Sequence, residues 1–247
     1  MTVSLSPHQF DRLLDSYPGI QCLSLDCFDT LLWRDTHSPR DIFQALPGTS
    51  VIQRSSAERR ARIAAEMAGR GSEISIGEIY AELMPNADNG EREAAIAAEI
   101  AAEARHCFGF APVVQLMRAA KERGLRIIIV SDTYLDARQL QELIASAAGE
   151  EVTDLIDQIF CSSKFGKSKA GGLYHEVLRK LKLPGSAVLH IGDNKRADIE
   201  GVTPFGANTA HLAQFSGSAE QRLRLEAAID KMIHPHAAET ASTTLPH

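Results

Sequence analysis

The chain has 247 residues, more than one typical domain of about 150 residues and fewer than two. Hydrophobic residues make up 44% of it and charged residues 23%, a composition that excludes disordered, collagen-like and disulfide-scaffold proteins. The net charge is -6, with 26 Lys and Arg against 32 Asp and Glu, so no broad basic surface is available for a nucleic-acid partner. We therefore expect a globular protein that is either one large domain or a core carrying an insert.

The two ends and the cysteines bear on localisation. The N-terminus lacks a basic segment followed by an apolar one, and no run of about 18 apolar residues occurs, so we expect no membrane partner. The four cysteines lack Cys-x-x-Cys spacing and are typical of small buried hydrophobes in a reducing compartment, which predicts a cytoplasmic protein. Residues 234–247 lack apolar periodicity and predict a flexible tail, or a linker to a fused or associated downstream domain.

Strands and helices are predicted to alternate along most of the chain. Short apolar runs predict strands buried on both faces at residues 20–25, 127–130, 158–161 and 187–191. Amphipathic patterns predict helices at residues 113–123, 137–147 and 172–183. This alternation indicates an α/β fold built on a doubly wound parallel sheet.

One long segment interrupts the alternation. Residues 34–109 are rich in Ala, Glu and Arg and predict an inserted helical unit, in which Ser75 and Glu78 have the spacing of a capping box. Because ligands of open α/β sheets bind at the carboxyl ends of the strands, we expect this insert to form a lid there, joined by short crossings near Arg34 and Gly109. The predicted domains are a discontinuous core (1–33 and 110–233), a cap (34–109) and the tail.

The first two predicted strands end in polar residues. Asp26 follows the first strand and Thr30 comes four residues later, which places a carboxylate where a nucleophile is expected; an aspartate that opens a turn explains the same segment. The second strand ends in Ser131 and Asp132, where a hydroxyl and backbone N–H groups suit a phosphate oxygen. A serine at a strand end is more often a turn or N-cap residue.

The last two strands are followed by lysines and acids. Three lysines (164, 167 and 169) follow the third strand, and although most loop lysines are solvated, a carboxylate that attacks an anionic phosphoryl group needs a cation. Gly192 and Asp193 end the fourth strand, and Asp198 lies five residues further on. We expect Gly192 to permit a tight backbone turn and the two carboxylates to join Asp26 in an oxygen cage suited to Mg²⁺; an Asx turn before an acidic helix start is the alternative.

In chain order these strand ends supply Asp, Ser, Lys and Gly-Asp, and in this set the chain resembles the haloacid dehalogenase (HAD) superfamily of hydrolases. The resemblance covers residues 18–33 and 112–212, and the insert stands where that family has its helical C1 cap. It implies a Rossmann-like core and phosphoryl or halide chemistry at the carboxyl edge of the sheet.

The resemblance also implies roles for individual residues. Asp26 is the expected nucleophile, and Lys169 is chosen over the other two lysines by its distance from Ser162. The expected phosphate-binding residues are Thr30, Ser131, Asp132 and Lys169. The expected Mg²⁺ ligands are Asp26, the backbone carbonyl of Phe28, Asp193 and Asp198.

The first motif departs from the family pattern. Phe28 stands where HAD phosphatases have a second Asp that protonates the leaving oxygen, and an acid appears one residue later as Asp29, a candidate replacement. In dehalogenases an aromatic residue in this position is familiar, because halide leaves without a proton. The motif, with the segment Ser131 to Leu135, also resembles a bacterial HAD subgroup of predicted hydrolases sometimes found with glycosyltransferases.

The expected function is a Mg²⁺-dependent phosphatase that acts on a small phosphorylated metabolite, such as a sugar phosphate, through an aspartyl-phosphate. The alternatives are a non-catalytic or very slow HAD-like domain attached to another enzyme, and a dehalogenase or phosphotransferase. In the insert, Arg59, Arg60 and Arg62 either grip an anionic substrate or form a solvated helix face. Trp33 packs either at the cap hinge or in the core.

Overall fold

The computed structural model describes residues 3–5, 7–36 and 38–214. Its centre is a parallel six-stranded sheet in the order β1-β8-β7-β2-β5-β6. The strands are β1 (Val3–Leu5), β2 (Cys22–Leu25), β5 (Arg126–Ser131), β6 (Gln158–Cys161), β7 (Val188–Gly192) and β8 (Asn208–Leu212). The predicted doubly wound α/β fold is thereby confirmed. Two strands of this sheet were not predicted: β1 has only three residues, and polar side chains interrupt the apolar pattern of β8.

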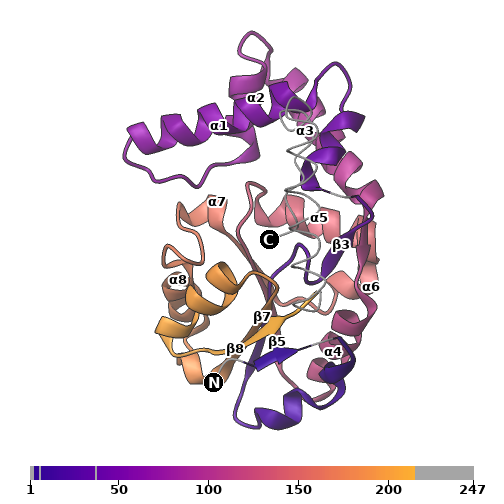
Figure 1. Ribbon diagram of the computed structural model, residues 1–247, viewed down its shortest axis with the longest axis vertical. Coiled ribbons are helices and arrows are strands. Elements are labelled where there is room, and N and C mark those ends of the chain that lie inside the picture. Colours follow the sequence, from indigo (N-terminus) through magenta and orange to yellow (C-terminus); the bar gives the residue numbers. More distant parts are fainter. Residues whose placement is uncertain (1–2, 6, 37, 215–247) are drawn as a thin grey trace, which may run out of the picture.

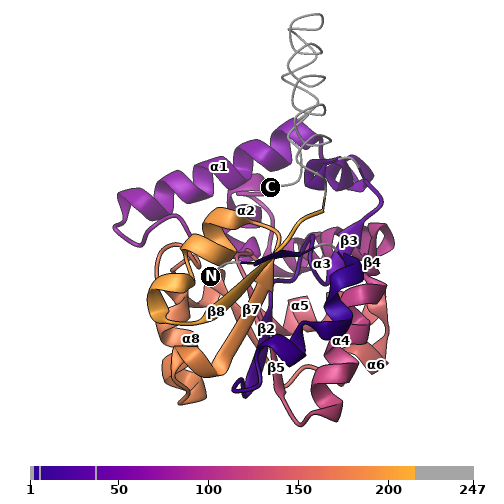
Figure 2. The same ribbon diagram turned by 60° about the horizontal axis from the view of Figure 1, so that its bottom comes forward.

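Helices cover both faces of this sheet because neighbouring strand residues point to opposite sides. Leu23 and Leu25 of β2 pack in the cluster that includes the apolar faces of α4 (Ala111–Glu122) and α5 (Ala137–Ala148). Cys22 packs in the opposite cluster, with α8 (Leu173–Leu181). Figures 1 and 2 show α8 on one side of the strands and α4 on the other. The central strands β2 and β7 are therefore apolar on both faces, as predicted, except for Ser24 in β2 and His190 in β7.

Shorter helical elements connect these parts. They are η1 (Pro7–Arg12), η2 (Leu14–Ser16), η3 (Pro39–Ala45), α6 (Glu150–Thr153), α7 (Ser162–Phe165), η4 (Gly185–Ala187), η5 (Lys195–Glu200) and η6 (Thr203–Phe205). Cys22, Cys27, Cys107 and Cys161 are buried and free. Within the described ranges, no helix has the length and apolar character needed to cross a membrane.

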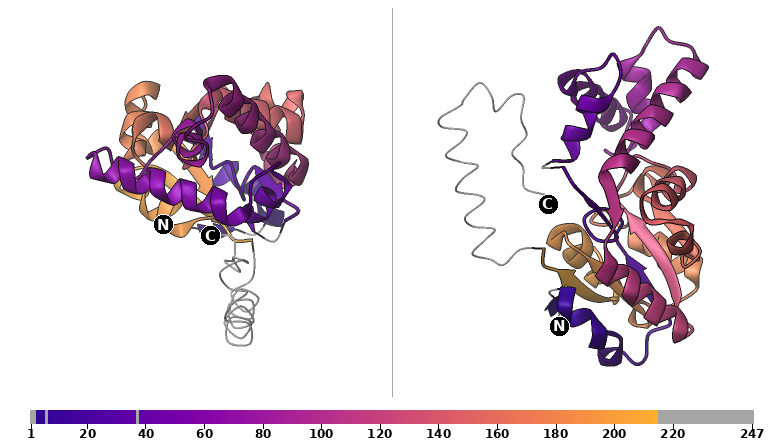
Figure 3. Two further views of the ribbon diagram at one scale, coloured as in Figure 1. Left: turned by 90° about the horizontal axis from the view of Figure 1, so that it is seen from above. Right: turned by 90° about the vertical axis from the view of Figure 1, so that its right-hand side faces the viewer.

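The segment between β3 (Leu32–Arg34) and β4 (Cys107–Gly109) is helical. It contains η3, α1 (Val51–Met67), α2 (Ile76–Leu83) and α3 (Asn89–His106), and α1 and α2 lie beyond one end of the sheet (Figures 1 and 3). The two crossings pair with each other as an antiparallel ribbon, with Leu32 opposite Gly109. We call the helical segment 38–106 the cap. Its status as a separate domain stays a prediction, and residues 215–247, with the expected tail, lie outside the described residues.

Local chemistry explains the cap helices. The expected capping box at Ser75 forms, with the Ser75 hydroxyl accepting from the Glu78 backbone N–H and the Glu78 carboxylate accepting from the Ser75 backbone N–H. α1 packs against α2 through a stripe of small residues, Ala57, Ala61 and Ala65, which permits close approach of the two helices. At the ribbon, Trp33 stacks on Phe110 with ring centroids 4.1 Å apart, so this tryptophan lies between the crossing and the start of α4.

Candidate active site

The polar residues that follow the strands meet at one edge of the sheet. β2 lies between β7 and β5, with Leu25 opposite both Ile191 and Ile129. Asp26 continues this register, because its backbone N–H donates to the carbonyl of Ile191 at 2.9 Å. Ser131, 1% exposed, ends β5 beside it, and Asp193 follows β7. Parallel pairing therefore brings three residues from distant parts of the chain to one edge.

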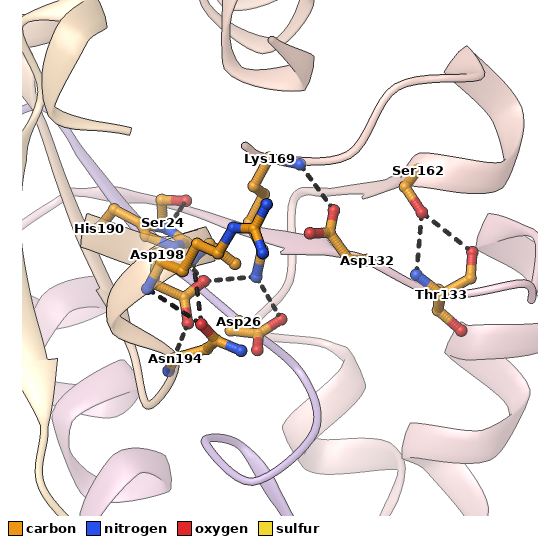
Figure 4. A network of polar contacts seen from close by, with 11 residues as sticks. Ser24, Asp26, Asp132, Thr133, Ser162, Lys169, His190, Asn194 and Asp198 are labelled. Carbon is orange, nitrogen blue, oxygen red and sulfur yellow. Dashed lines mark hydrogen bonds and ion pairs between the residues drawn. The ribbon is translucent and has the colours of Figure 1, made fainter. Parts of the chain in front are cut away.

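Lys169 is the lysine that enters this centre. Its side chain is 1% exposed, and its ammonium nitrogen lies 2.8 Å from an oxygen of Asp26 and 2.5 Å from an oxygen of Asp198 (Figure 4). Burial lowers the pKa of this ammonium, but Asp198 and Asp26 outweigh burial and hold it above its ordinary value. Lys167 instead lies 3.5 Å from Glu176 on the surface. The structure thus places a permanent positive charge against Asp26.

Three carboxylates cluster at this centre, and two of them, Asp26 and Asp198, contact the Lys169 ammonium. Oxygens of Asp26, Asp193 and Asp198 lie within 4.8 Å of one another. Burial raises the pKa of Asp193 to about 9, and the neighbouring carboxylates of Asp26 and Asp198 add to the effect. Burial also raises the pKa of Asp26, against the opposing charge of Lys169. Ionisation of all three acids would leave an excess of negative charge that a bound divalent cation would relieve, and their hard oxygen donors suit Mg²⁺.

Asp198 differs from the other two acids because both oxygens of its carboxylate accept hydrogen bonds from the protein. It accepts from Nε2 of His190 at 3.1 Å and from the backbone N–H of Asn194 at 2.9 Å, in addition to Lys169. Burial alone would raise the pKa of Asp198. Lys169 and His190 lower it by a larger amount, so this pKa lies below its ordinary value. With these donors in place, Asp198 fits the positioning of Lys169 better than direct metal ligation. Asp26 and Asp193 fit the ligand role.

His190 is a site residue that the sequence did not suggest. It is completely buried in β7, and its Nδ1 lies 2.8 Å from the hydroxyl of Ser24 in β2. The two residues support Asp198 from inside the sheet (Figure 4). The available signal was a histidine in the middle of an otherwise apolar strand.

Gly192 is needed here for a different reason from the one expected. It does not adopt a left-handed conformation, so a tight turn does not explain it. A Cβ at this position would overlap the carboxyl carbon of Asp198. The absence of a side chain at Gly192 is therefore what allows Asp198 to approach the end of β7.

Phe28 and Asp29 form the loop that follows Asp26. The Phe28 ring packs under the guanidinium of Arg34, 4.4 Å from it, and the Asp29 carboxylate lies 3.5 Å from the same guanidinium. Asp29 has a φ of 58°, a left-handed conformation that Asp tolerates better than most residues. Burial raises its pKa, with Arg34 opposing. Asp29 therefore presents a carboxyl group to the adjoining cavity, as a replacement acid would.

That cavity has a volume of about 360 Å³ and lies between the carboxyl edge of the sheet and the cap. Phe28, Asp29 and Asp132 line it from the core side, and Ile76 and Glu99 line it from the cap. The volume is in the range of small-molecule sites.

The phosphate contacts expected of Thr30 and Asp132 stay predictions. Thr30 is fully buried, and its hydroxyl has no hydrogen-bond partner among the described residues. The Asp132 carboxylate accepts from the backbone N–H of Lys169 at 2.8 Å and faces the cavity, so of this residue only the backbone suits a phosphate. The roles of Asp26, Ser131 and Lys169 stay predictions that their positions support.

The cap contains an arginine that the sequence did not single out. Arg54 is completely buried, donates to both carboxylate oxygens of Glu99 at 2.6 and 2.7 Å, and stacks on Tyr134 of the core loop at 5.0 Å. By contrast, Arg60 and Arg62 form surface ion pairs, with Glu82 and Glu58 respectively. In the sequence, Arg54 has helical spacing with Ala57, Ala61 and Ala65, the buried face of α1. This spacing could have indicated that Arg54 is buried.

Fold and site together define a hydrolase-type α/β protein with a buried aspartate at its sheet edge, and the comparisons give the family. A family profile described as haloacid dehalogenase-like hydrolase matches residues 20–206. The chain belongs to this family. Comparison with curated protein sequences gives no match.

Solved structures with the same fold include several dehalogenases. The L-2-haloacid dehalogenase from Xanthobacter autotrophicus is 20% identical, with a TM-score of 0.59 over 87% of this chain and 88% of that one. The 2-haloacid dehalogenase from Pseudomonas syringae is 18% identical, with a TM-score of 0.55 over 77% and 85%. A haloacid dehalogenase-like hydrolase from Xanthomonas campestris is 17% identical, with a TM-score of 0.51 over 85% and 91%. At these identities the likeness concerns the fold and leaves the substrate class open.

Proposed function

We propose that this hydrolase is a Mg²⁺-dependent phosphatase that acts on a small phosphorylated metabolite through an aspartyl-phosphate on Asp26. The observation that carries the proposal is the excess of carboxylates at the nucleophile: oxygens of Asp26, Asp193 and Asp198 lie within 4.8 Å of one another, and the Lys169 ammonium pairs with Asp26 and Asp198 but not with Asp193. A site that attacks an anionic phosphoryl group needs such a cation-holding cluster.

In this mechanism an oxygen of Asp26 attacks phosphorus, the P–O bond to the leaving group breaks, and water then hydrolyses the acyl phosphate. Lys169, held by Asp198, neutralises one side of the attacking carboxylate. Ser131, at the end of β5, is placed to donate its hydroxyl to a phosphoryl oxygen. Mg²⁺, when bound by Asp26, Asp193 and the carbonyl of Phe28, would neutralise charge on the transferring oxygens.

A dehalogenase is the second candidate, favoured by Phe28 in the position of the usual second Asp. In that reaction the carboxylate attacks an uncharged carbon and halide leaves without a proton. No divalent cation is needed between the reactants, so Asp193 would have no role. A non-catalytic domain is the third candidate, and for it the buried Lys169–Asp26 pair would serve stability alone.

Asp193→Asn tests the metal role directly. We expect hydrolysis of an aryl phosphate by the wild-type protein to require Mg²⁺, and the variant to need at least about tenfold more Mg²⁺ for half-maximal rate, because one anionic ligand is lost. Asp154→Asn, on the exposed end of α6, is the matched control and should titrate as wild type. An unchanged Mg²⁺ titration would remove Asp193 from the ligand set, and metal-independent release of halide from a haloacid would favour the dehalogenase.

A second prediction concerns the source of the leaving-group proton, for which Asp29, in the loop with Phe28, is the candidate. If Asp29 supplies the leaving-group proton, Asp29→Asn should slow alkyl phosphates by about 10²–10⁴-fold and leave aryl phosphates nearly unaffected, since an aryl oxide leaves without a proton. If no residue supplies it, the wild type itself should prefer aryl phosphates strongly, and Phe28→Asp should narrow that gap. Ordinary rates for alkyl phosphates in both the wild type and Asp29→Asn would contradict both versions.

A further inference from the structure

The cavity beside the nucleophile carries an unusual balance of charge. Its lining includes five acidic side chains, Asp29, Glu73, Glu99, Glu103 and Asp132, and only two basic ones, Arg34 and Arg62. The chemical character of whatever enters depends on which of these charges are already neutralised by neighbours.

Both arginines are occupied by carboxylates of the protein. Arg34 donates to Glu103 at 2.7 Å and lies 3.5 Å from Asp29. Arg62 donates to Glu58 at 2.8 Å and to the backbone carbonyl of Ser72 at 2.8 Å. Neither guanidinium is therefore available to an anionic substrate. For Arg62 this argues against the interpretation that the arginines of α1 grip such a substrate.

Two of these acids, Glu73 and Asp132, form no ion pair in the described part of the chain. Glu73 lies in the loop between α1 and α2, half-buried, and among the described residues no hydrogen bond or ion pair holds its carboxylate. Asp132 lies on the opposite, core side and accepts only the backbone N–H of Lys169. Both carboxylates line the same cavity. Burial raises the pKa of Asp132 to about 6, with Lys169 opposing and the charges of Asp26 and Glu73 adding to the rise. Cap and core thus each contribute to the cavity one carboxylate that has no ion-pair partner.

The rest of the lining limits the size and polarity of the ligand. Ile76, Ile100 and Leu135 give the cavity an apolar wall. A volume of about 360 Å³ is sufficient for a short carbon chain.

From this charge balance we infer the substrate class: a phosphomonoester whose leaving group is a short carbon chain bearing an ammonium or similar cation, bound between Glu73 and Asp132. The inference rests on the proposed function, because the phosphate is assigned to the Asp26 and Lys169 side of the site. A carboxylate or second phosphate on the leaving group would meet these carboxylates without ion-pair partners, whereas an ammonium would form charge-assisted hydrogen bonds. Glu73 and Asp132 thus select the charge of the leaving group, and the Asp26 and Lys169 side of the site selects the phosphoryl group.

Calorimetric titration with three non-hydrolysable phosphonates of matched length tests the inference. Aminopropyl-, hydroxypropyl- and carboxyethylphosphonate place an ammonium, a hydroxyl and a carboxylate at the same distance from phosphorus. In saturating Mg²⁺ we expect the ammonium compound to bind at least about tenfold more tightly than the hydroxyl compound, and the carboxylate compound most weakly. Glu73→Gln should reduce the ammonium preference severalfold, and Glu66→Gln, an exposed acid of α1 outside the cavity, should not.

Equal binding of the three phosphonates, a preference for the carboxylate, no binding of any of them, or a preference unchanged in Glu73→Gln would overturn the inference. Measured hydrolysis of phosphate esters distinguishes a failure of this inference from a failure of the proposed function. If the ammonium phosphonate binds best but no phosphate ester is hydrolysed, the charge selection stands and the phosphatase assignment fails. If an aryl phosphate is hydrolysed with Mg²⁺ but the phosphonates show no charge order, the phosphatase assignment stands and the selection fails.

Discussion

Asp26→Asn should abolish phosphate-ester hydrolysis while leaving the fold intact, with a loss of about 10⁴-fold or more in kcat. The amide has almost the same shape as the carboxylate but is not a nucleophile, so no acyl phosphate forms. The fold is expected to persist because the change removes one of three clustered acids. Lys169 keeps its contact with Asp198, which is itself held by His190. Steady-state rates with an aryl phosphate, together with circular dichroism, give the measurement.

The matched control for this change is Asp15→Asn, which removes a surface carboxylate that pairs with Arg123 at 2.7 Å far from the cavity. It should leave the rate unchanged. Retention of more than a few per cent of wild-type activity by Asp26→Asn, with an unchanged spectrum, would exclude Asp26 as the nucleophile.

Arg54→Met should lower the free energy of unfolding by about 3–5 kcal/mol. The side chains of Arg54 and Glu99 are 0% and 2% exposed, and removal of the guanidinium leaves the Glu99 carboxylate buried with only the hydroxyl of Tyr80 to donate to it. Methionine has a similar length and stays apolar, so the loss reports the unpaired charge more than a void. Urea unfolding followed by circular dichroism measures the change.

Two further variants distinguish charge from packing. Arg60→Met breaks the Arg60–Glu82 pair, whose side chains are 53% and 39% exposed, and should cost less than about 1 kcal/mol. Adding Glu99→Gln to Arg54→Met removes the stranded charge and should recover a large part of the stability, which a double-mutant cycle quantifies. If Arg54→Met and Arg60→Met cost the same, or if the second substitution recovers nothing, the buried pair is not what stabilises the cap.

Much of the core was predictable because its signals are local. The runs that became β2, β5, β6 and β7 are apolar at every position or nearly so, which is what burial on both faces requires. Since all of these strands are parallel, residues that follow them must appear at one edge, and this rule alone brought Asp26 and Asp193 together. The capping box at Ser75 is equally local, involving a pair of residues three positions apart.

Two features depend on tertiary packing and could not be predicted from the sequence. They are the pairing of charges around the cavity and the buried hydrogen bonds that hold Asp198. Whether an arginine on a helix is solvated or buried depends on what packs against it, and the partner of Arg54 is 45 residues away in the sequence. Likewise, Ser24 and His190 are separated by 166 residues and meet only because β2 and β7 are neighbours. The sequence by itself determined where the strands end and which chemical groups stand there. The tertiary structure decided which of those groups are neutralised and which remain charged, because ionic partners are chosen by packing and not by spacing along the chain.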